Sequence, residues 1–592
     1  MSRTKALPAI ALLSGAVLVL GACSGGGGGG NASSGDQSIA EMAVPRGESG
    51  DGYTSPETKE SDLIQLSLDK PFTTYNNATA DGNSSYNTYA LTLIQTGAWK
   101  LDGNNKVILN KDVMESVEVT SKDPQEVTWK IKPGVKWSDG EAWDCDDFYM
   151  QWFTQSGKAK KGDGSPYFLA AGTTGYELID GSCKDNQTFV GKFSEKYPDY
   201  QDLFSADVLP AHIVEKQAGV EDITKLTPTT DAATLTKVAD FWNTKWNGFD
   251  KALQPGSGQY VMTEFVANQS VTLERNPNWA GKPGGPKKIF MKAVPDPVAQ
   301  AQALENGEVQ VNGLTQPDVN AATRLKGLSA QGITFGAAPG LSFEHLDLNF
   351  KHPALSKEEV RKAFFQCVKR QDIADKLISE IQSDVKPLGS LIFFPGEEGY
   401  KDVYADKSKG SAEEAKKILS GAGWTQGADG VFAKDGVKAS FKISHTDIPR
   451  RKQTVELIQG QCKEAGIEVI DDTDPNFLDE RVSNGDYHVA LFAWSGSPFK
   501  SSKKSIYQTG GGQNWQGLSS KGFDENFTKG VSQTSIADAT KYYQEADKAL
   551  ADTYGSLPLF QMPNMWAFKG LDRVYFQSYY GVAAFANEWQ QK

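Results

Sequence analysis

Strand-like and helix-like segments alternate through the second half of the chain, and this alternation constrains the fold more than any other feature. Apolar residues at every second position predict a strand over 437–443. A capping box at 356–359 predicts the start of a helix, whose apolar face would carry Val360, Phe364 and Cys367. A second capping box at 411–414 predicts another helix. Strands alternating with helices are typical of an α/β domain.

A predicted β-hairpin at Gly256–Asn276 divides the chain into two differently built parts. Its sequence predicts a strand over Gln259–Phe265, a turn that contains Asn268, and a return strand over Val271–Arg275. The residues before it are rich in aromatic side chains and glycine, and those after it alternate. Such a hairpin fits a chain that returns to a first domain before it enters a second. Taken alone, the same pattern also fits an ordinary surface hairpin.

Length and charge narrow the class of protein. With 592 residues, the chain is long enough for three to four domains of about 150 residues each. The net charge is −13, which argues against nucleic-acid binding because that function needs a concentrated basic surface. The only long apolar run lies at the N-terminus, so no later segment is predicted to span a membrane.

The first 22 residues have the pattern of a signal peptide. Arg3 and Lys5 supply the positive start, and an apolar stretch follows over Ala9–Leu20. The sequence Leu20–Cys23 then resembles a bacterial lipobox, in which Cys23 becomes the lipidated first residue of the mature protein. The alternative is an ordinary cleaved signal with an incidental cysteine. We expect an exported protein that Cys23 anchors to the outer face of the cell membrane.

Residues 23–59 are expected to form a flexible tether. Six consecutive glycines follow Ser24, and residues 31–59 are rich in Ser, Gly, Asp and Glu. This composition has too little apolar surface to offset the entropy of ordering the chain. A lipid and a loose tether would hold a globular body near the membrane without embedding it.

Four further cysteines are expected to form disulfides. An even number in an exported chain favours pairing, and four cysteines allow three connectivities. One pair falls in each half of the chain, so we expect Cys145 to pair with Cys183 and Cys367 to pair with Cys462. For the second pair, the alternative is two buried free thiols on apolar helix faces.

Several sequence landmarks occur in one order along the chain. The segment Ile131–Trp152 reads IKPGVKWSDGEAWDCDDFYMQW, and the hairpin reads GSGQYVMTEFVANQSVTLERNPNW. HLDLNF follows at 345–350, and LPLF at 557–560. Over about 61–592 the chain resembles the family 5 extracellular solute-binding proteins, the oligopeptide- and dipeptide-binding components of ABC importers.

This resemblance implies a two-lobed α/β fold of the periplasmic-binding-protein type (type II, cluster C-like) with an extra subdomain in the first lobe. The expected core of lobe I comprises residues 60–78, 255–335 and 545–592. The extra subdomain would be 79–254, and lobe II would be 336–544. A monomer of this kind closes its lobes over a small solute or peptide and delivers it to ABC permease subunits. It needs no cofactor and performs no reaction.

The resemblance also implies where a ligand would bind. In peptide-binding relatives a strand ends in a tryptophan, which Trp494 matches, and a nearby aspartate pairs with the ligand amine. Ser497 stands where that aspartate is expected, and a serine cannot supply the charge. Glu344 is the expected substitute. Tyr75 and Asn76 follow the first strand, where relatives contact the ligand backbone.

A non-peptide solute is the alternative ligand. Trp494 and Trp515 would then stack on it, while Asn514 and Asn76 would form hydrogen bonds with it, beside Ser495 and Ser497. Both tryptophans could equally belong to a packed core.

Other classes of function have weaker support. The five histidines are scattered, with no HExxH, GxSxG or GxxxxGK[ST] pattern, so a secreted hydrolase would have to use a base such as His445 in an unrecognised site. The acids Asp139, Asp144, Asp146 and Asp147 lack the spacing of a calcium loop. A sensor or adhesin ectodomain would bind a ligand in the same body without delivering it.

Overall fold

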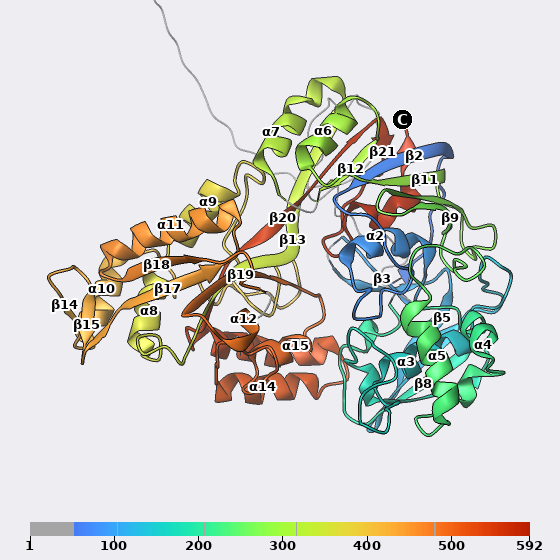
Figure 1. Ribbon diagram of the computed structural model, residues 1–592, viewed down its shortest axis with the longest axis horizontal. Helices are drawn as coiled ribbons and strands as arrows, with labels where there is room; N and C mark the ends of the chain where they lie inside the picture. The colour runs from blue at the N-terminus through green and yellow to red at the C-terminus, as the bar shows by residue number, and fades with distance from the viewer. Residues whose placement is uncertain (1–51, 104, 206–207, 315–316, 479–480) are drawn as a thin grey trace, which may run out of the picture.

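The computed structural model describes residues 52–103, 105–205, 208–314, 317–478 and 481–592, and these form two lobes of mixed α/β structure (Figure 1). The expected signal peptide, Cys23 and the tether up to residue 51 lie outside the described residues.

A ten-stranded mixed sheet runs through both lobes. Its order is β18-β17-β19-β13-β20-β12-β2-β11-β10-β9. The long antiparallel strands β13 (Ile333–Leu348) and β20 (Ser556–Lys569) lie at its centre and pass from one lobe to the other (Figure 1). The flanking strands in lobe I are β12 (Val311–Leu314), β2 (Ser61–Leu68), β11 (Pro286–Ala293), β10 (Ser270–Arg275) and β9 (Tyr260–Val266). Those in lobe II are β19 (Val489–Ser495), β17 (Ser440–His445) and β18 (Glu468–Thr473).

The hairpin predicted from the sequence is confirmed as β9 and β10. Asn268 lies in its turn with φ of 61°, in the left-handed region that asparagine tolerates better than most residues. The hairpin is at the lobe I edge of the sheet, where β10 pairs with β11. The chain thus completes one edge of lobe I before it builds lobe II.

The extra subdomain packs onto the core of lobe I without a separate interior. Its antiparallel sheet has the order β5-β6-β8-β7. One continuous apolar cluster includes Trp129 of this subdomain and Ile64 of β2. Its strands and helices are β5 (Met114–Lys122), β6 (Gln125–Ile131), β7 (Ile179–Asp185), β8 (Thr188–Phe193), α3 (Cys145–Gln155), α4 (Ala211–Ala218) and α5 (Ala232–Thr244). Lobe I also contains β3 (Trp99–Leu101), β4 (Val107–Asn110), α2 (Ser85–Ile94), α6 (Pro297–Glu305) and α7 (Val319–Gly327).

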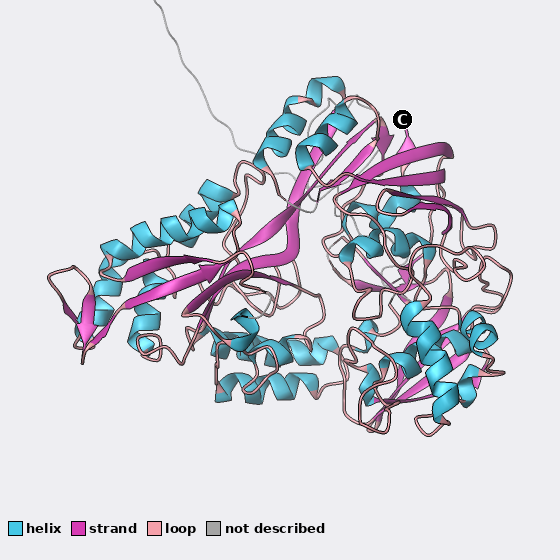
Figure 2. Cartoon of the chain, viewed as in Figure 1, coloured by secondary structure: helices cyan, strands magenta, loops and turns pink. Residues whose placement is uncertain are grey.

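Lobe II confirms the alternation of helices and strands predicted for the second half (Figure 2). Its own apolar core includes Phe364, Phe441 and Ile458. Its helices are α8 (Glu358–Cys367), α9 (Arg370–Leu377), α10 (Ala412–Gly421), α11 (Pro449–Glu464), α12 (Arg481–Asn484), α13 (Lys503–Tyr507), α14 (Lys521–Val531) and α15 (Ile536–Ala551).

Of the two predicted capping boxes, one is wrong, and of the other only the N-cap residue is confirmed. In α10 the Ser411 hydroxyl accepts the Glu414 N–H, as expected for an N-cap. In α8 the N-cap is Lys357, and no side chain caps that end. The Ser356 hydroxyl instead donates to the carbonyl of Pro353. The helix therefore begins one residue later than the motif predicts, because the Ser356 hydroxyl is used in the preceding turn.

Two domain boundaries differ from the expected ones. The ordered body begins before residue 59, because β1 (Gly52–Tyr53) pairs with β4 and Tyr53 is buried. The return to lobe I comes after residue 545, because Tyr543 and Leu550 of α15 are buried in the lobe II core. Within β20, Phe560 still belongs to that core and Trp566 belongs to the core of lobe I.

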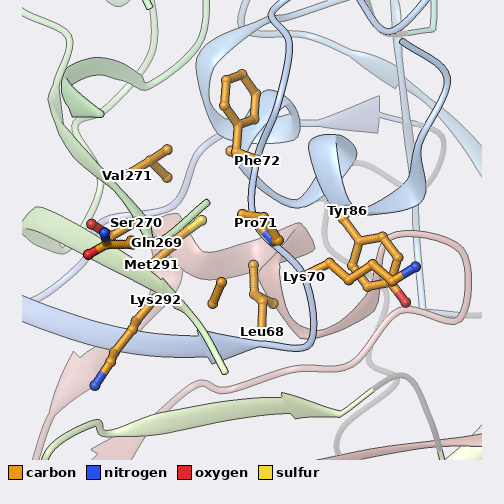
Figure 3. A pocket seen from close by; sticks show the side chains of 12 residues that line it. Leu68, Lys70, Pro71, Phe72, Tyr86, Gln269, Ser270, Val271, Met291 and Lys292 are labelled. Carbon is orange, nitrogen blue, oxygen red and sulfur yellow. The ribbon is translucent and has the colours of Figure 1, made fainter. Parts of the chain in front are cut away.

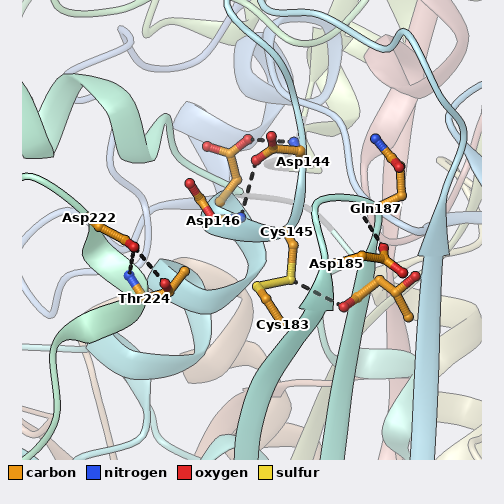
Figure 4. Close-up of a disulfide and its surroundings, with 10 residues drawn as sticks. Asp144, Cys145, Asp146, Cys183, Asp185, Gln187, Asp222 and Thr224 are labelled. Atoms are coloured by element: carbon orange, nitrogen blue, oxygen red, sulfur yellow. Dashed lines mark hydrogen bonds between the residues drawn. A yellow bond between two sulfur atoms is a disulfide. The ribbon is translucent and has the colours of Figure 1, made fainter.

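Both disulfides have the expected pairing. Cys145 bonds to Cys183 and fastens the start of α3 to β7 (Figure 4). Cys367 bonds to Cys462 and joins α8 to α11. The alternative that Cys367 and Cys462 are free thiols is therefore wrong.

Candidate functional site

Three cavities follow the boundary between the lobes, and residues of both lobes line each of them. The Arg450 cavity, of about 710 Å³, lies between Tyr86 of α2 and Arg450 of α11. The Asp202 cavity, of about 620 Å³, lies between Asp202 of lobe I and Ser497 of lobe II. An outer cavity of about 910 Å³ lies between Trp99 and Phe499. Large cavities between two parts of a protein are where small-molecule sites are commonly found.

The Arg450 and Asp202 cavities form one central cleft. Both are lined by Ser495, Gly496 and Tyr579, so the ligand space is continuous across these residues. Tyr579 is 43% exposed, an unusual exposure for a large aromatic side chain. Leu478, in the Arg450 cavity, is 41% exposed. Exposed apolar side chains inside a cleft are suited to contact with a ligand.

Glu344 and two arginines give the Arg450 cavity its charge. Glu344, on β13, is almost fully buried and forms salt bridges with Arg450 at 3.0 Å and Arg451 at 3.2 Å. Burial raises the pKa of Glu344, but the charges of Arg451 and Arg450 and their hydrogen bonds outweigh it, so the net pKa is lowered. The glutamate is therefore ionised, and two guanidinium groups face one carboxylate.

The position of the two arginines is itself informative. They lie in the first turn of α11, where the backbone carries a partial positive charge that disfavours cations. Their presence there is explained by Glu344 and by the cleft, and not by helix stability. A basic pair directly after a proline that starts a helix is the signal that the sequence interpretation missed.

The Asp202 cavity is lined mainly by neutral polar side chains. Among the described residues that line it, Asp202 is the one that can carry a charge. Burial, and then the charge of Asp199, raise the pKa of Asp202 to about 7. The neutral polar side chains are those of Asn77, Asn83, Thr88, Gln151, Gln155, Thr174, Tyr176, Ser205, Ser495, Ser497, Tyr579 and Tyr580.

Three of the expected ligand residues line the central cleft. Glu344 and Ser495 line the Arg450 cavity, and Ser495 and Ser497 line the Asp202 cavity. Glu344 is committed to its two arginines, so it does not offer an unpaired acid to a ligand amine.

The two expected tryptophans lie on the other face of the sheet. Side chains alternate along β19, so Ala493 and Ser495 face the cleft while Trp494 points to the opposite side. The Trp494 ring lies 5.1 Å from Phe492 and 5.3 Å from Trp515, and both tryptophans pack against a small apolar cluster. This environment is that of packed side chains.

The remaining expected residues are engaged in local structure. Tyr75 is fully buried, stacks on Trp246 and donates its hydroxyl to the carbonyl of Pro255. Asn76 is buried, and its amide donates to the carbonyl of Trp242 at 2.9 Å. The Asn514 amide donates to the carbonyls of Gln508 and Leu518, which fixes its own loop. None of these three residues lines either cavity of the central cleft.

The candidate base His445 is also enclosed. It is fully buried, with Nδ1 2.8 Å from the Thr446 carbonyl oxygen and Nε2 3.3 Å from Asp471. Among the described residues, no group of three His, Cys, Asp or Glu side chains is arranged to hold a metal ion.

The acidic landmark at the start of α3 has a structural role. Asp144 caps the helix by accepting the N–H of Asp146 at 3.2 Å (Figure 4). The buried Asp147 carboxylate accepts hydrogen bonds from the Trp137 indole at 3.0 Å and the Ala211 N–H at 2.8 Å. Burial nevertheless raises the pKa of Asp147 well above its usual range. The motif thus fastens the preceding turn to the helix.

A further pocket in lobe I is too small to bind a solute. It lies between Pro71 and Phe72 on one side and Val271 and Met291 of the sheet on the other (Figure 3). Its volume is about 10 Å³, which is no more than one water molecule needs.

No helix in the described part of the chain is both long and apolar enough to cross a membrane.

Comparisons with known proteins give consistent matches. The model of the bacterial extracellular solute-binding proteins, family 5 Middle, matches residues 108–517. The oligopeptide-binding protein OppA of Mycobacterium tuberculosis is 25% identical over 518 residues, which cover 86% of this chain and 81% of OppA. Among solved structures, the periplasmic EDTA-binding protein EppA is similar with a TM-score of 0.78 and 24% identity, over 91% of this chain and 98% of EppA. The oligopeptide-binding protein AppA of Bacillus subtilis, in complex with a nonapeptide, has a TM-score of 0.67 and 20% identity, over 90% of this chain and all of AppA.

Proposed function

This chain belongs to the bacterial extracellular solute-binding proteins of family 5, and we propose that the solute it captures for an ABC importer is an oligopeptide. The peptide would lie in the central cleft, held by both lobes, until the protein meets the permease. Delivery depends on closure of the lobes, which excludes water and fixes the ligand.

The continuity of the central cleft is the observation that carries this proposal. Each of its two cavities has the volume of a site for a drug-sized molecule, and Tyr579 lines both. A ligand that fills both must be extended. Neutral side-chain amides and hydroxyls suit the many N–H and C=O groups of a peptide backbone, because these groups must be hydrogen-bonded when they leave water.

The charge of the Arg450 cavity supports the same class of ligand. The two guanidinium groups of Arg450 and Arg451 exceed the single charge of Glu344, and Asp447, which also lines the cavity, is paired with Lys452 at 2.5 Å. One positive charge is thus left for one ligand carboxylate. Arginine binds carboxylates strongly through paired N–H groups.

A metal chelate or another polycarboxylate is the second candidate. The arginine pair favours it, and EppA is an EDTA-binding protein of similar fold. Glu344 weighs against it, because the cleft offers one uncompensated positive charge and a polycarboxylate carries several negative ones.

The mode of attachment completes the proposal. The lipobox-like sequence that ends at Cys23 supports a lipid anchor on the outer face of the cell membrane. The described residues begin at Gly52, and we propose that the chain between Cys23 and this point acts as the tether. A monomer is proposed, as both walls of the cleft come from one chain.

Mass spectrometry of molecules that copurify with the protein tests the proposed ligand. The chain from residue 24 onward is purified without denaturant, and the bound fraction is released by acid. A set of peptides is the expected result. A single chelate or other non-peptide would overturn the peptide assignment in favour of the second candidate.

A further inference from the structure

We propose that Asp202 binds the ammonium group of the ligand, so that the ligand lies with its cationic end at the extra subdomain and its carboxylate at Arg450 and Arg451. This inference rests on the proposed function and deepens it, because it assigns a direction to the bound ligand. Four observations support it.

The first observation is that the Asp202 carboxylate has no compensating partner. It lines the Asp202 cavity, and no described residue forms a salt bridge or side-chain hydrogen bond with it. Asp202 stands at the end of the short 3₁₀ turn Tyr200–Asp202, on the lobe I wall. An acid that is desolvated without a partner is costly, so a cation of the ligand would gain strongly there.

The second observation is a further acid behind it. Asp199 is fully buried, and its Oδ2 accepts the N–H of Ser501 at 2.6 Å. Its Oδ1 has no hydrogen-bond partner among the described residues. The cation Lys500 acts on Asp199 but forms its own salt bridge with Glu397 at 2.5 Å. The local potential around Asp202 is therefore negative.

The third observation is an unpaired donor in the same cavity. Gln155 is about nine-tenths buried and lines the Asp202 cavity. Its Nε2 has no hydrogen-bond partner in the part of the chain that the structure describes. A buried donor without a partner is costly and is suited to a ligand carbonyl. An ammonium group close to a carbonyl is the chemistry of a peptide amino terminus.

The fourth observation is the separation of the charges along the cleft. The uncompensated acid lies in one cavity and the excess guanidinium charge in the other, and Ser495, Gly496 and Tyr579 lie between them. A zwitterionic, extended ligand matches this arrangement in one direction only. In the reverse direction each end of the ligand would meet a like charge.

Binding of two matched pentapeptide libraries tests the inference. One library has free amino termini and the other is N-acetylated, and each is titrated into the wild-type protein after its copurifying ligand is removed. Acetylation is expected to weaken binding at least tenfold. In Asp202→Asn the same modification is expected to change binding less than threefold. Asp240 is exposed on α5 of the same subdomain. In Asp240→Asn, acetylation is expected to weaken binding as much as it does in the wild type.

The possible outcomes separate this inference from the proposed function. Equal binding of both libraries by the wild type would overturn the role of Asp202 and leave the peptide ligand intact. The role of Asp202 would also be overturned if acetylation weakened binding to Asp202→Asn as much as binding to the wild type. Absence of binding for both libraries would overturn the peptide ligand and this inference together. Asp202 is half-buried and forms no salt bridge with a described residue, so Asp202→Asn is expected to fold; Asp202→Glu, which keeps the charge, should restore part of the loss of affinity caused by acetylation.

Discussion

The two ends of the cleft differ in the sign of the charge that is left uncompensated. Glu344 is buried against two guanidinium groups, whereas Asp202 is desolvated beside another acid. The sequence alone identified Glu344 as a cleft acid but could not identify its partners, because Arg450 and Arg451 are more than a hundred positions away. Asp202 carried no signal at all, since its importance depends on what the fold leaves unpaired.

Replacing one arginine should separate binding from stability. Arg450→Gln removes the excess positive charge while Arg451 keeps its pair with Glu344. We expect affinity for the copurifying ligand to fall about tenfold, roughly 1.4 kcal/mol, with a small change in stability. Calorimetric titration and thermal unfolding measure the two effects. Unchanged affinity would show that the ligand does not reach this cavity.

The tryptophan suggested by sequence resemblance should act mainly on stability. Trp494 packs against Phe492 and Trp515 on the face opposite the cleft. Trp494→Ala is therefore expected to lower the free energy of unfolding by roughly 2–4 kcal/mol, because it leaves a cavity among packed rings. Ligand affinity should change less than threefold. A large loss of affinity with unchanged stability would instead place the indole on the ligand, and Leu169→Ala, at an exposed site, serves as the control.

At the scale of elements, the sequence predicted what depends on local pattern. The hairpin β9–β10 and the helix face of α8 follow from alternation and helical spacing, and both are present. The lobe boundary predicted near residue 545 differs from the structure because it depends on tertiary contacts. α15 packs into lobe II through Tyr543 and Leu550, and its amphipathic pattern does not specify which lobe it covers.

Burial of one acid in α15 should make stability depend on pH. Asp547 is almost fully buried, and burial raises its pKa to about 7, although the Leu391 N–H donates to it. The unfolded value is about 3.9, so the native state binds this proton more tightly. The resulting stabilisation is complete below about pH 4 and is lost as the pH rises through 7.

The Asp547→Asn variant tests this dependence. Between pH 5 and pH 8 the wild type should lose about 2 kcal/mol more stability than the variant, at up to 1.4 kcal/mol per pH unit. Denaturant unfolding at both pH values measures the difference. Parallel pH dependence of the two proteins would show that Asp547 does not titrate in this range.

For the whole molecule, the described residues hold the lobes together through the sheet and through smaller contacts, one of which joins Lys326 of lobe I to the Glu380 and Ile381 carbonyls of lobe II. The strands β13 and β20 connect them through the sheet. On the other side of the cleft, Ser501 of lobe II contacts Asp199 and lies 3.3 Å from the Tyr197 hydroxyl, both in lobe I. The contact at Ser501 is small, so its loss on opening of the cleft costs few interactions.

Fluorescence energy transfer between the lobes should detect closure. Labels are attached to cysteines introduced at the exposed positions Lys237 on α5 and Lys416 on α10. Transfer is expected to increase when the copurifying peptides are added back to ligand-free protein. A control pair at Lys416 and Lys529, both in lobe II, should not change. No change in the first pair would contradict binding by closure.

The pairing of β13 with β20 determines how the length of a bound ligand affects the angle between the lobes. The two strands are neighbours in one ladder, so sliding or twisting of one lobe against the other would break hydrogen bonds along its length. The register is interrupted between Pro339 and Phe343 and again between Glu344 and His345, and the ladder is weakest over this segment. We therefore expect bending of this segment to be the main relative motion of the lobes. Longer solutes would stop closure of the lobes earlier than shorter ones. The surface of the closed protein would then differ with the length of the bound solute.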